Sequence, residues 1–202
     1  MKLTLATWLT VARIAAIPPL LLLMAIPGSR AAWGAFAVYV LASLTDWLDG
    51  YIARKSKQVS RLGKCLDPIA DKLLVAGVLM MLAQNGTFEG AQIVPACAIL
   101  LRELSVSGLR EFLAGSSIDV PVSRLAKWKT TAQLIALGLL ILGPYAPMAQ
   151  YLNLAGLVCL WFAAGLTLVT GFAYGRAGWK HIATGGSQKT EIRISPQRCP
   201  DN

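Results

Sequence analysis

Long apolar segments alternate with short polar connections along most of this 202-residue chain. Each apolar segment is close to the ~20 residues that an α-helix needs to cross the hydrocarbon core of a bilayer. The pattern therefore predicts an all-α polytopic membrane bundle of six transmembrane helices. The expected spans are residues 9–26, 32–53, 67–83, 92–112, 126–142 and 151–174.

The start of the third span has two interpretations. Asp67 followed by Pro68 is typical of a helix N-terminus, with Asp67 as the cap and Pro68 as the first helical residue. Alternatively, the helix begins at Ser60 and Pro68 bends it from within. The sequence leaves both alternatives open.

Composition supports a membrane protein, since 55% of the residues are hydrophobic and only 14% are charged. The net charge of +9 has two explanations, nucleic-acid binding or positive charge kept on the cytoplasmic side of a membrane. No aromatic-plus-basic stretch of the kind that binds nucleic acid appears, so we expect membrane lipids and no nucleic acid as partners. We expect residues 1–183 to form the transmembrane domain and the polar residues 184–202 to form a mobile tail.

Lys and Arg residues gather in the connections on one side of the predicted bundle. They lie near the start of the first span, between the second and third spans, between the fourth and fifth, and after the sixth. The connections on the other side carry only Arg30. Because cytoplasmic connections are enriched in Lys and Arg, we expect both termini to be cytoplasmic, in a bacterial-type inner membrane.

Five charged residues of different spans fall at one depth. With a rise of ~1.5 Å per residue, they come out ~15–20 Å from the outer ends of their spans. Long basic side chains at that depth can reach water by snorkelling, whereas short aspartates cannot. We therefore expect a shared, water-accessible cavity on the cytoplasmic side. The five residues are Arg13, Asp46, Asp71, Arg102 and Lys129.

Four of the ten acidic residues lie at the edges of the second and third spans. Asp46 and Asp49 are three residues apart, and Asp67 and Asp71 are four apart, so on helices each pair projects from one face. Two such faces turned toward each other would gather four carboxylates, which is unfavourable at neutral pH without cations. Hard oxygen ligands suit Mg²⁺, Mn²⁺ or Ca²⁺ rather than zinc.

The region around these aspartates resembles the signature of the CDP-alcohol phosphotransferase family. The matching residues are Asp46, Asp49, Gly50, Ala53, Arg54, Gly63, Asp67 and Asp71. The resemblance implies a homodimeric integral membrane enzyme that displaces CMP from a CDP-linked lipid with an alcohol as nucleophile. It implies that all four aspartates are metal ligands and that Asp71 is also the base for the acceptor hydroxyl. Two Mg²⁺ or Mn²⁺ ions there would neutralise charge on the phosphate oxygens.

Small residues accompany the aspartates of the second span. Gly50 and Ala53 lie one helical turn apart, which permits close approach of either a nucleotide or a neighbouring helix. The resemblance favours the nucleotide, and it makes Arg54 a candidate pyrophosphate contact beside Gly63. Arg61 joins these CDP-lipid candidates because it is close to Gly63, although the neighbouring lysines are more typical of topology and headgroup charges.

The fourth and fifth spans are unusually polar in their cytoplasmic halves. Arg102 and Glu103 are sequence neighbours that cannot face each other on one helix, so we expect each to have a partner on another helix or in the cavity. Arg110, Lys127 and Lys129 place several positive charges together on the cytoplasmic side, which suits a phosphate group, and Arg102 is a further candidate. Glycerol 3-phosphate as acceptor needs such a cluster, whereas serine does not.

These polar stretches, with residues 10–13, resemble the phosphatidylglycerophosphate synthases within the family, over roughly residues 7–180. Ala126 stands where those enzymes usually have Gly, and Ala6 and Thr7 stand where Asn and Pro are common. The resemblance implies CDP-diacylglycerol and sn-glycerol 3-phosphate as substrates. Serine, inositol phosphate and phosphatidylglycerol are the alternative acceptors.

Two other classes of protein place carboxylates in membrane helices. Aspartate-rich membrane prenyltransferases hold Mg²⁺ on pyrophosphate, but their clusters lack the pattern of Gly50, Ala53, Arg54 and Gly63. A cation transporter needs acidic groups along a transmembrane pathway, whereas the aspartates here lie in one layer. Both alternatives fit the sequence less well than a CDP-lipid enzyme.

Overall fold

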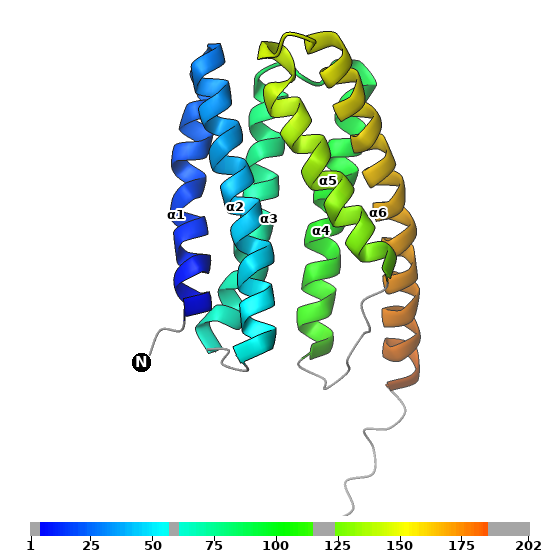
Figure 1. Ribbon diagram of the computed structural model, residues 1–202. Coiled ribbons are helices and arrows are strands. Elements are labelled where there is room, and N and C mark those ends of the chain that lie inside the picture. Colours follow the sequence, from blue (N-terminus) through cyan, green and yellow to red (C-terminus); the bar gives the residue numbers. More distant parts are fainter. Residues whose placement is uncertain (1–4, 57–60, 115–123, 186–202) are drawn as a thin grey trace, which may run out of the picture.

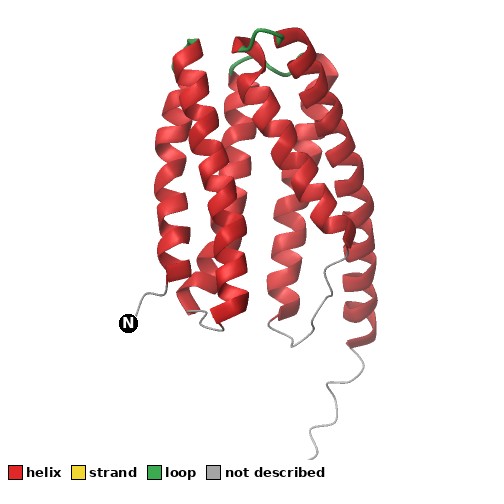
Figure 2. Cartoon of the chain, viewed as in Figure 1, coloured by secondary structure: helices red, strands yellow, loops and turns green. Residues whose placement is uncertain are grey.

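The computed structural model describes residues 5–56, 61–114 and 124–185, where every regular element is helical, as predicted. Figure 2 shows short loops, in green, between α1 and α2, between α3 and α4, and between α5 and α6. The side chains of residues 5, 6, 47, 49–56, 61, 62, 64, 65, 110–114, 124–127 and 173–185 are not described. The α-helices are α1 (Leu5–Ala25), α2 (Ser29–Ser56), α3 (Arg61–Gln84), α4 (Ile93–Ala114), α5 (Arg124–Leu142) and α6 (Ala149–Gly185). The 3-10 turns η1 (Gly90–Gln92) and η2 (Gly143–Tyr145) precede α4 and follow α5.

The six predicted spans coincide with the six α-helices to within a few residues at most ends. Helix α3 begins at Arg61 and runs through Pro68, so the interpretation of Asp67 as an N-terminal cap is wrong. Pro68 has no backbone N–H, so one hydrogen bond is missing from the first half of α3. Helix α6 extends beyond the predicted span to Gly185. Residues 186–202 of the predicted tail lie outside the described residues.

The helices run alternately up and down, so each end of the bundle holds one terminus of every α-helix (Figure 1). At this end α1, α3 and α5 begin, and α2, α4 and α6 end. Residues near the start of one helix therefore lie beside residues near the end of its neighbour. This arrangement brings the predicted charged residues of different spans to one end, hereafter the polar end.

The interior of the bundle is apolar and closely packed. Helix α1 packs against α2 and α3, and α6 packs against α4 and α5. A Cβ atom added to Gly156 of α6 would meet the side chain of Leu140 of α5 at 2.8 Å, so glycine permits the close approach of these helices. The hydroxyl of Tyr39 on α2 donates a hydrogen bond of 3.0 Å to the Leu134 carbonyl on α5. This bond connects the half of the bundle formed by α1, α2 and α3 to the half formed by α4, α5 and α6.

The outer surface of the bundle is also apolar. Leu22, Leu101 and Phe172 are 67%, 66% and 76% exposed, and many other large apolar side chains share this surface. Three helical segments among the described residues are long and apolar enough to cross a membrane: Thr7–Ala25, Gly90–Leu109 and Ala149–Phe172. Apolar surface of this extent is unfavourable in water and favourable in hydrocarbon. These are the properties of a membrane protein.

Candidate active site

Arg13 joins α1 to the carboxylates of α2 and α3 at the polar end. Its Nη1 atom lies 2.6 Å from Asp46 Oδ1 and 3.8 Å from Asp67 Oδ1. One turn earlier on α1, the hydroxyl of Thr10 donates a hydrogen bond of 3.1 Å to the same oxygen of Asp67. Asp46 and Asp67 therefore face each other across Arg13, as the two aspartate-bearing helix faces are predicted to do. We call these four residues the carboxylate cluster.

The members of the carboxylate cluster differ sharply in burial. The Arg13 side chain is 0% exposed, whereas those of Asp46 and Asp67 are 42% and 47% exposed. A buried guanidinium is costly unless it is paired with a negative charge, and the two aspartates supply that charge. Because the carboxylates themselves remain accessible, they are able to bind a further ligand.

Asp71 lies one turn after Asp67 on α3 and connects the carboxylate cluster to the other half of the bundle. Its carboxylate interacts electrostatically with Asp46 of α2 and with Glu103 of α4. It also interacts with Lys129 of α5. Three carboxylates on three helices repel one another, so bound cations would stabilise their arrangement.

A second group of polar residues joins α4, α5 and α6, and we call it the basic cluster. Lys129 of α5 forms an ion pair with Glu103 of α4, and Nη2 of Arg102 donates a hydrogen bond of 3.0 Å to Thr170 Oγ1 of α6. Arg102 and Glu103 thus each have a partner on another helix, as predicted. The expectation that they do not face each other is wrong, because Arg102 Nη1 also lies 3.6 Å from Glu103 Oε1.

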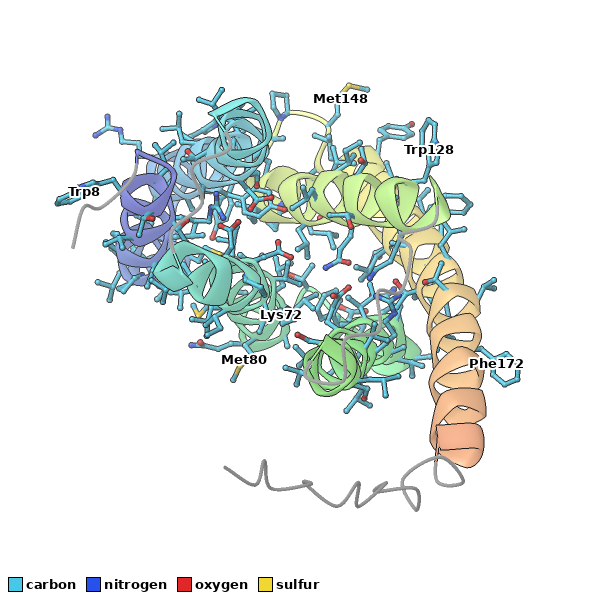
Figure 3. All side chains as sticks on the ribbon, turned by 90° about the horizontal axis from the view of Figure 1, so that it is seen from below. Trp8, Lys72, Met80, Trp128, Met148 and Phe172 are labelled. Atoms are coloured by element: carbon cyan, nitrogen blue, oxygen red, sulfur yellow. The ribbon has the colours of Figure 1, made fainter. Side chains whose placement is uncertain are left out.

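Both clusters lie at the polar end of the bundle. Figure 3 views this end and shows nitrogen and oxygen atoms gathered between the helices, whereas Trp8, Met80, Trp128 and Phe172 point outward. The residues predicted to share one depth therefore belong to one set of interactions. Arg13 contacts Asp46, Asp71 interacts with both clusters, and Arg102 and Lys129 meet at Glu103.

The described carboxylates supply part of a ligand set for a divalent cation. Asp46 and Asp67 offer hard oxygen atoms from facing helices, which suits Mg²⁺ or Mn²⁺. Among the side chains that the structure describes, no group of three or more His, Cys, Asp or Glu could hold a metal ion. Asp49 of the predicted set lies outside those side chains. The donor chemistry fits a metal, and Arg13 supplies positive charge between two of the donors.

Several predicted site residues have side chains outside the described part of the chain, so their roles stay predictions. They are Asp49, Gly50, Ala53 and Arg54 of α2, Arg61 of α3, Arg110 of α4 and Lys127 of α5. Gly63 is described and lies in the first turn of α3.

Thr10, Glu103 and Thr170 contact site residues but are not among the predicted site residues. Arg13 is predicted by its depth and, as part of residues 10–13, by the resemblance. The signal for Arg13 is its position inside an apolar span at the level of Asp46. Glu103 could have been found as a carboxylate beside a predicted phosphate site. Thr170 gives no such signal, because a threonine within an apolar helix is commonplace.

The sequence profile of the family described as CDP-alcohol phosphatidyltransferase matches residues 3–169. The chain belongs to this family. The match includes α1 to α5 and the part of α6 up to residue 169, and it confirms the resemblance inferred from residues 46–71. Membership of this family excludes the two alternative classes considered from the sequence, the aspartate-rich prenyltransferases and the cation transporters.

This CDP-alcohol phosphatidyltransferase is similar to curated bacterial proteins over nearly its whole length. A Rickettsia bellii protein is 49% identical over 178 residues, which cover 88% of this chain and 97% of the relative. A Pseudomonas fluorescens protein is 39% identical over 194 residues, covering 94% and 96%. Both relatives are named CDP-diacylglycerol–glycerol-3-phosphate 3-phosphatidyltransferase.

Proposed function

We propose that this protein is a phosphatidylglycerophosphate synthase. It transfers the phosphatidyl group of CDP-diacylglycerol to sn-glycerol 3-phosphate and releases CMP. The observation that carries the proposal is the adjacency of the two clusters, carboxylates suited to a nucleotide-bound metal beside cations suited to a phosphate. The names of the relatives support the same pair of substrates.

The carboxylate cluster serves the CDP-lipid. Asp46, Asp49, Asp67 and Asp71 would hold a pair of Mg²⁺ or Mn²⁺ ions, which would neutralise charge on the pyrophosphate oxygens. Arg13 and Thr10 hold the carboxylates of Asp46 and Asp67 toward each other. The nucleotide and pyrophosphate are bound by the small and basic residues of the family signature and by Arg61, which is close to Gly63 in the sequence. The signature residues are Gly50, Ala53, Arg54 and Gly63.

The basic cluster serves the acceptor. Arg102 and Lys129, together with Arg110 and Lys127, bind the phosphate group of glycerol 3-phosphate by charge-assisted hydrogen bonds. The acceptor hydroxyl is then directed toward Asp71, which lies between the clusters. Its oxygen attacks the phosphorus that bears the lipid, the bond from that phosphorus to the CMP oxygen breaks, and the hydroxyl proton passes to Asp71.

The same proposal fixes the orientation in the membrane. All six α-helices span an inner membrane, with both termini and the polar end facing the cytoplasm, where CDP-lipid headgroups and glycerol 3-phosphate meet. The apolar outer surface and the one-sided distribution of Lys and Arg support this topology. The protein acts as a homodimer, an inference that rests on the resemblance to the family.

An acceptor panel tests the function. Purified protein is given CDP-diacylglycerol and Mg²⁺ with glycerol 3-phosphate, serine, inositol phosphate or phosphatidylglycerol, and CMP release is measured with the lipid product. We expect turnover with glycerol 3-phosphate only. CMP release with serine and none with glycerol 3-phosphate would reassign the acceptor while leaving the family chemistry intact.

A further inference from the structure

Arg102 crosses α6 at a position where that helix has no side chain. A Cβ atom added to Gly171 would meet Arg102 Cγ at 2.9 Å and Nε at 3.4 Å. The nearest atom, Cγ, belongs to the base of the Arg102 side chain. Moving only the guanidinium would therefore not relieve the close contact with an added Cβ atom. Gly171 therefore determines where the stem of Arg102 lies.

Thr170, the preceding residue, holds the other end of the same side chain. Its Oγ1 accepts a hydrogen bond of 3.0 Å from Arg102 Nη2. The threonine hydroxyl hydrogen is directed back into α6, where the carbonyl oxygens of Leu166 and Thr167 lie 2.8 and 3.1 Å away. This local bond orients the oxygen lone pairs toward Arg102.

Glu103 forms an ion pair with the other terminal nitrogen of Arg102. Its carboxylate lies 3.6 Å from Arg102 Nη1 and is also paired with Lys129. The Arg102 side chain is thus held by Gly171 at its stem, by Thr170 at Nη2 and by Glu103 at Nη1. Only 11% of this side chain is exposed. A guanidinium already held in one geometry loses less conformational entropy when it binds an anion.

We propose that Thr170 and Gly171 are positioning residues for the acceptor site. They fix Arg102 of α4 so that its guanidinium and Lys129 of α5 together receive the phosphate group of glycerol 3-phosphate. The inference rests on the proposed function, in which Arg102 and Lys129 bind that phosphate, and it adds α6 to the site. Both residues lie just beyond the segment matched by the family profile, which ends at residue 169.

Two pairs of variants test the role of α6. Gly171→Ala adds the Cβ atom against Arg102, and Gly165→Ala is its matched control on the same helix, because a Cβ at Gly165 would meet nothing within 4 Å. Thr170→Val removes the hydroxyl at nearly constant shape, and Thr170→Ser restores it. For each variant, kcat and the KM values for glycerol 3-phosphate and CDP-diacylglycerol are measured separately.

We expect Thr170→Val to raise the KM for glycerol 3-phosphate about tenfold, because one hydrogen bond to a charged group is lost. Gly171→Ala should raise this KM by a similar factor, because the added Cβ atom displaces the stem of Arg102. The KM for CDP-diacylglycerol should stay within about twofold of the wild-type value. Gly165→Ala should match the wild type, and Thr170→Ser should bring the KM for glycerol 3-phosphate back toward it. If Gly171→Ala does not fold, the two Thr170 variants decide.

Three results would overturn the inference. The first is an equal rise in both KM values, the second is an equal effect of Gly165→Ala, and the third is an unchanged KM for glycerol 3-phosphate in both test variants. In each case a wild-type enzyme that still makes phosphatidylglycerophosphate leaves the proposed function standing. A wild-type enzyme that does not use glycerol 3-phosphate would overturn both.

Discussion

The buried guanidinium of Arg13 on α1 lies 2.6 Å from the carboxylate of Asp46 on α2. The same nitrogen lies 3.8 Å from Asp67 on α3, so one positive charge serves two carboxylates from helices that would otherwise repel each other there. A divalent ion bound by these aspartates would supply charge of the same sign. Arg13 and bound ions therefore stabilise the same arrangement of α2 and α3.

Arg13→Gln should lower the thermal unfolding temperature by about 5 °C without divalent ions, because a buried charge-assisted hydrogen bond is lost. Added Mg²⁺ should raise the unfolding temperature more in this variant than in the wild type, since the ion replaces the missing charge. Thermal unfolding in detergent, with and without Mg²⁺, measures both effects. Arg30→Gln, a change of an exposed residue at the opposite end, is the control for charge. An identical Mg²⁺ response in the two variants would refute the shared role.

Asp71→Asn should reduce kcat at least about 100-fold, because an amide cannot accept the proton of the acceptor hydroxyl. The unfolding temperature should not fall, since the change removes a carboxylate that is repelled by Asp46 and Glu103. Steady-state CMP release and thermal unfolding provide the two measurements. Glu89→Gln removes an exposed carboxylate at the opposite end and should leave both unchanged. A near-normal rate in Asp71→Asn would exclude Asp71 as the base.

Chelation of divalent ions should abolish turnover, because the pyrophosphate charge would then face the carboxylates without compensation. We expect EDTA to stop CMP release and added Mg²⁺ or Mn²⁺ to restore it. Zn²⁺ should restore it poorly, since the site offers carboxylate oxygens and no His or Cys ligand is predicted in it. Activity that persists after exhaustive chelation would remove the metal from the proposal.

The positions of the helices could be predicted from the sequence because each helix coincides with a long apolar run. The N-terminal end of α3 was harder to place, since Asp67 and Pro68 carry the local signals of a helix start although the helix begins at Arg61. Tertiary packing overrides such local signals. Helix α6 continues past its apolar segment to Gly185, where apolar content no longer indicates length.

Contacts within the site were less predictable than the helices that carry it. The depth of Arg13 could be counted along the chain, but its pairing with Asp46 depends on which helices are neighbours. The contact between Arg102 and Glu103 was missed because adjacent positions on a helix point ~100° apart. That rule describes Cβ directions, and a side chain as long as arginine can bring its end back beside its neighbour.

Reversal of the ion pair between Lys129 and Glu103 separates structural support from acceptor binding. Lys129→Glu alone places a second carboxylate beside Glu103 and near Asp71, so it should lower both stability and activity. The double variant Lys129→Glu/Glu103→Lys restores opposite charges and should recover the unfolding temperature. It moves the cation from α5 to α4, however, so the KM for glycerol 3-phosphate should remain at least about tenfold above the wild-type value. Thermal unfolding and acceptor titration measure the two properties, and recovery of both would mean that Lys129 only supports the fold.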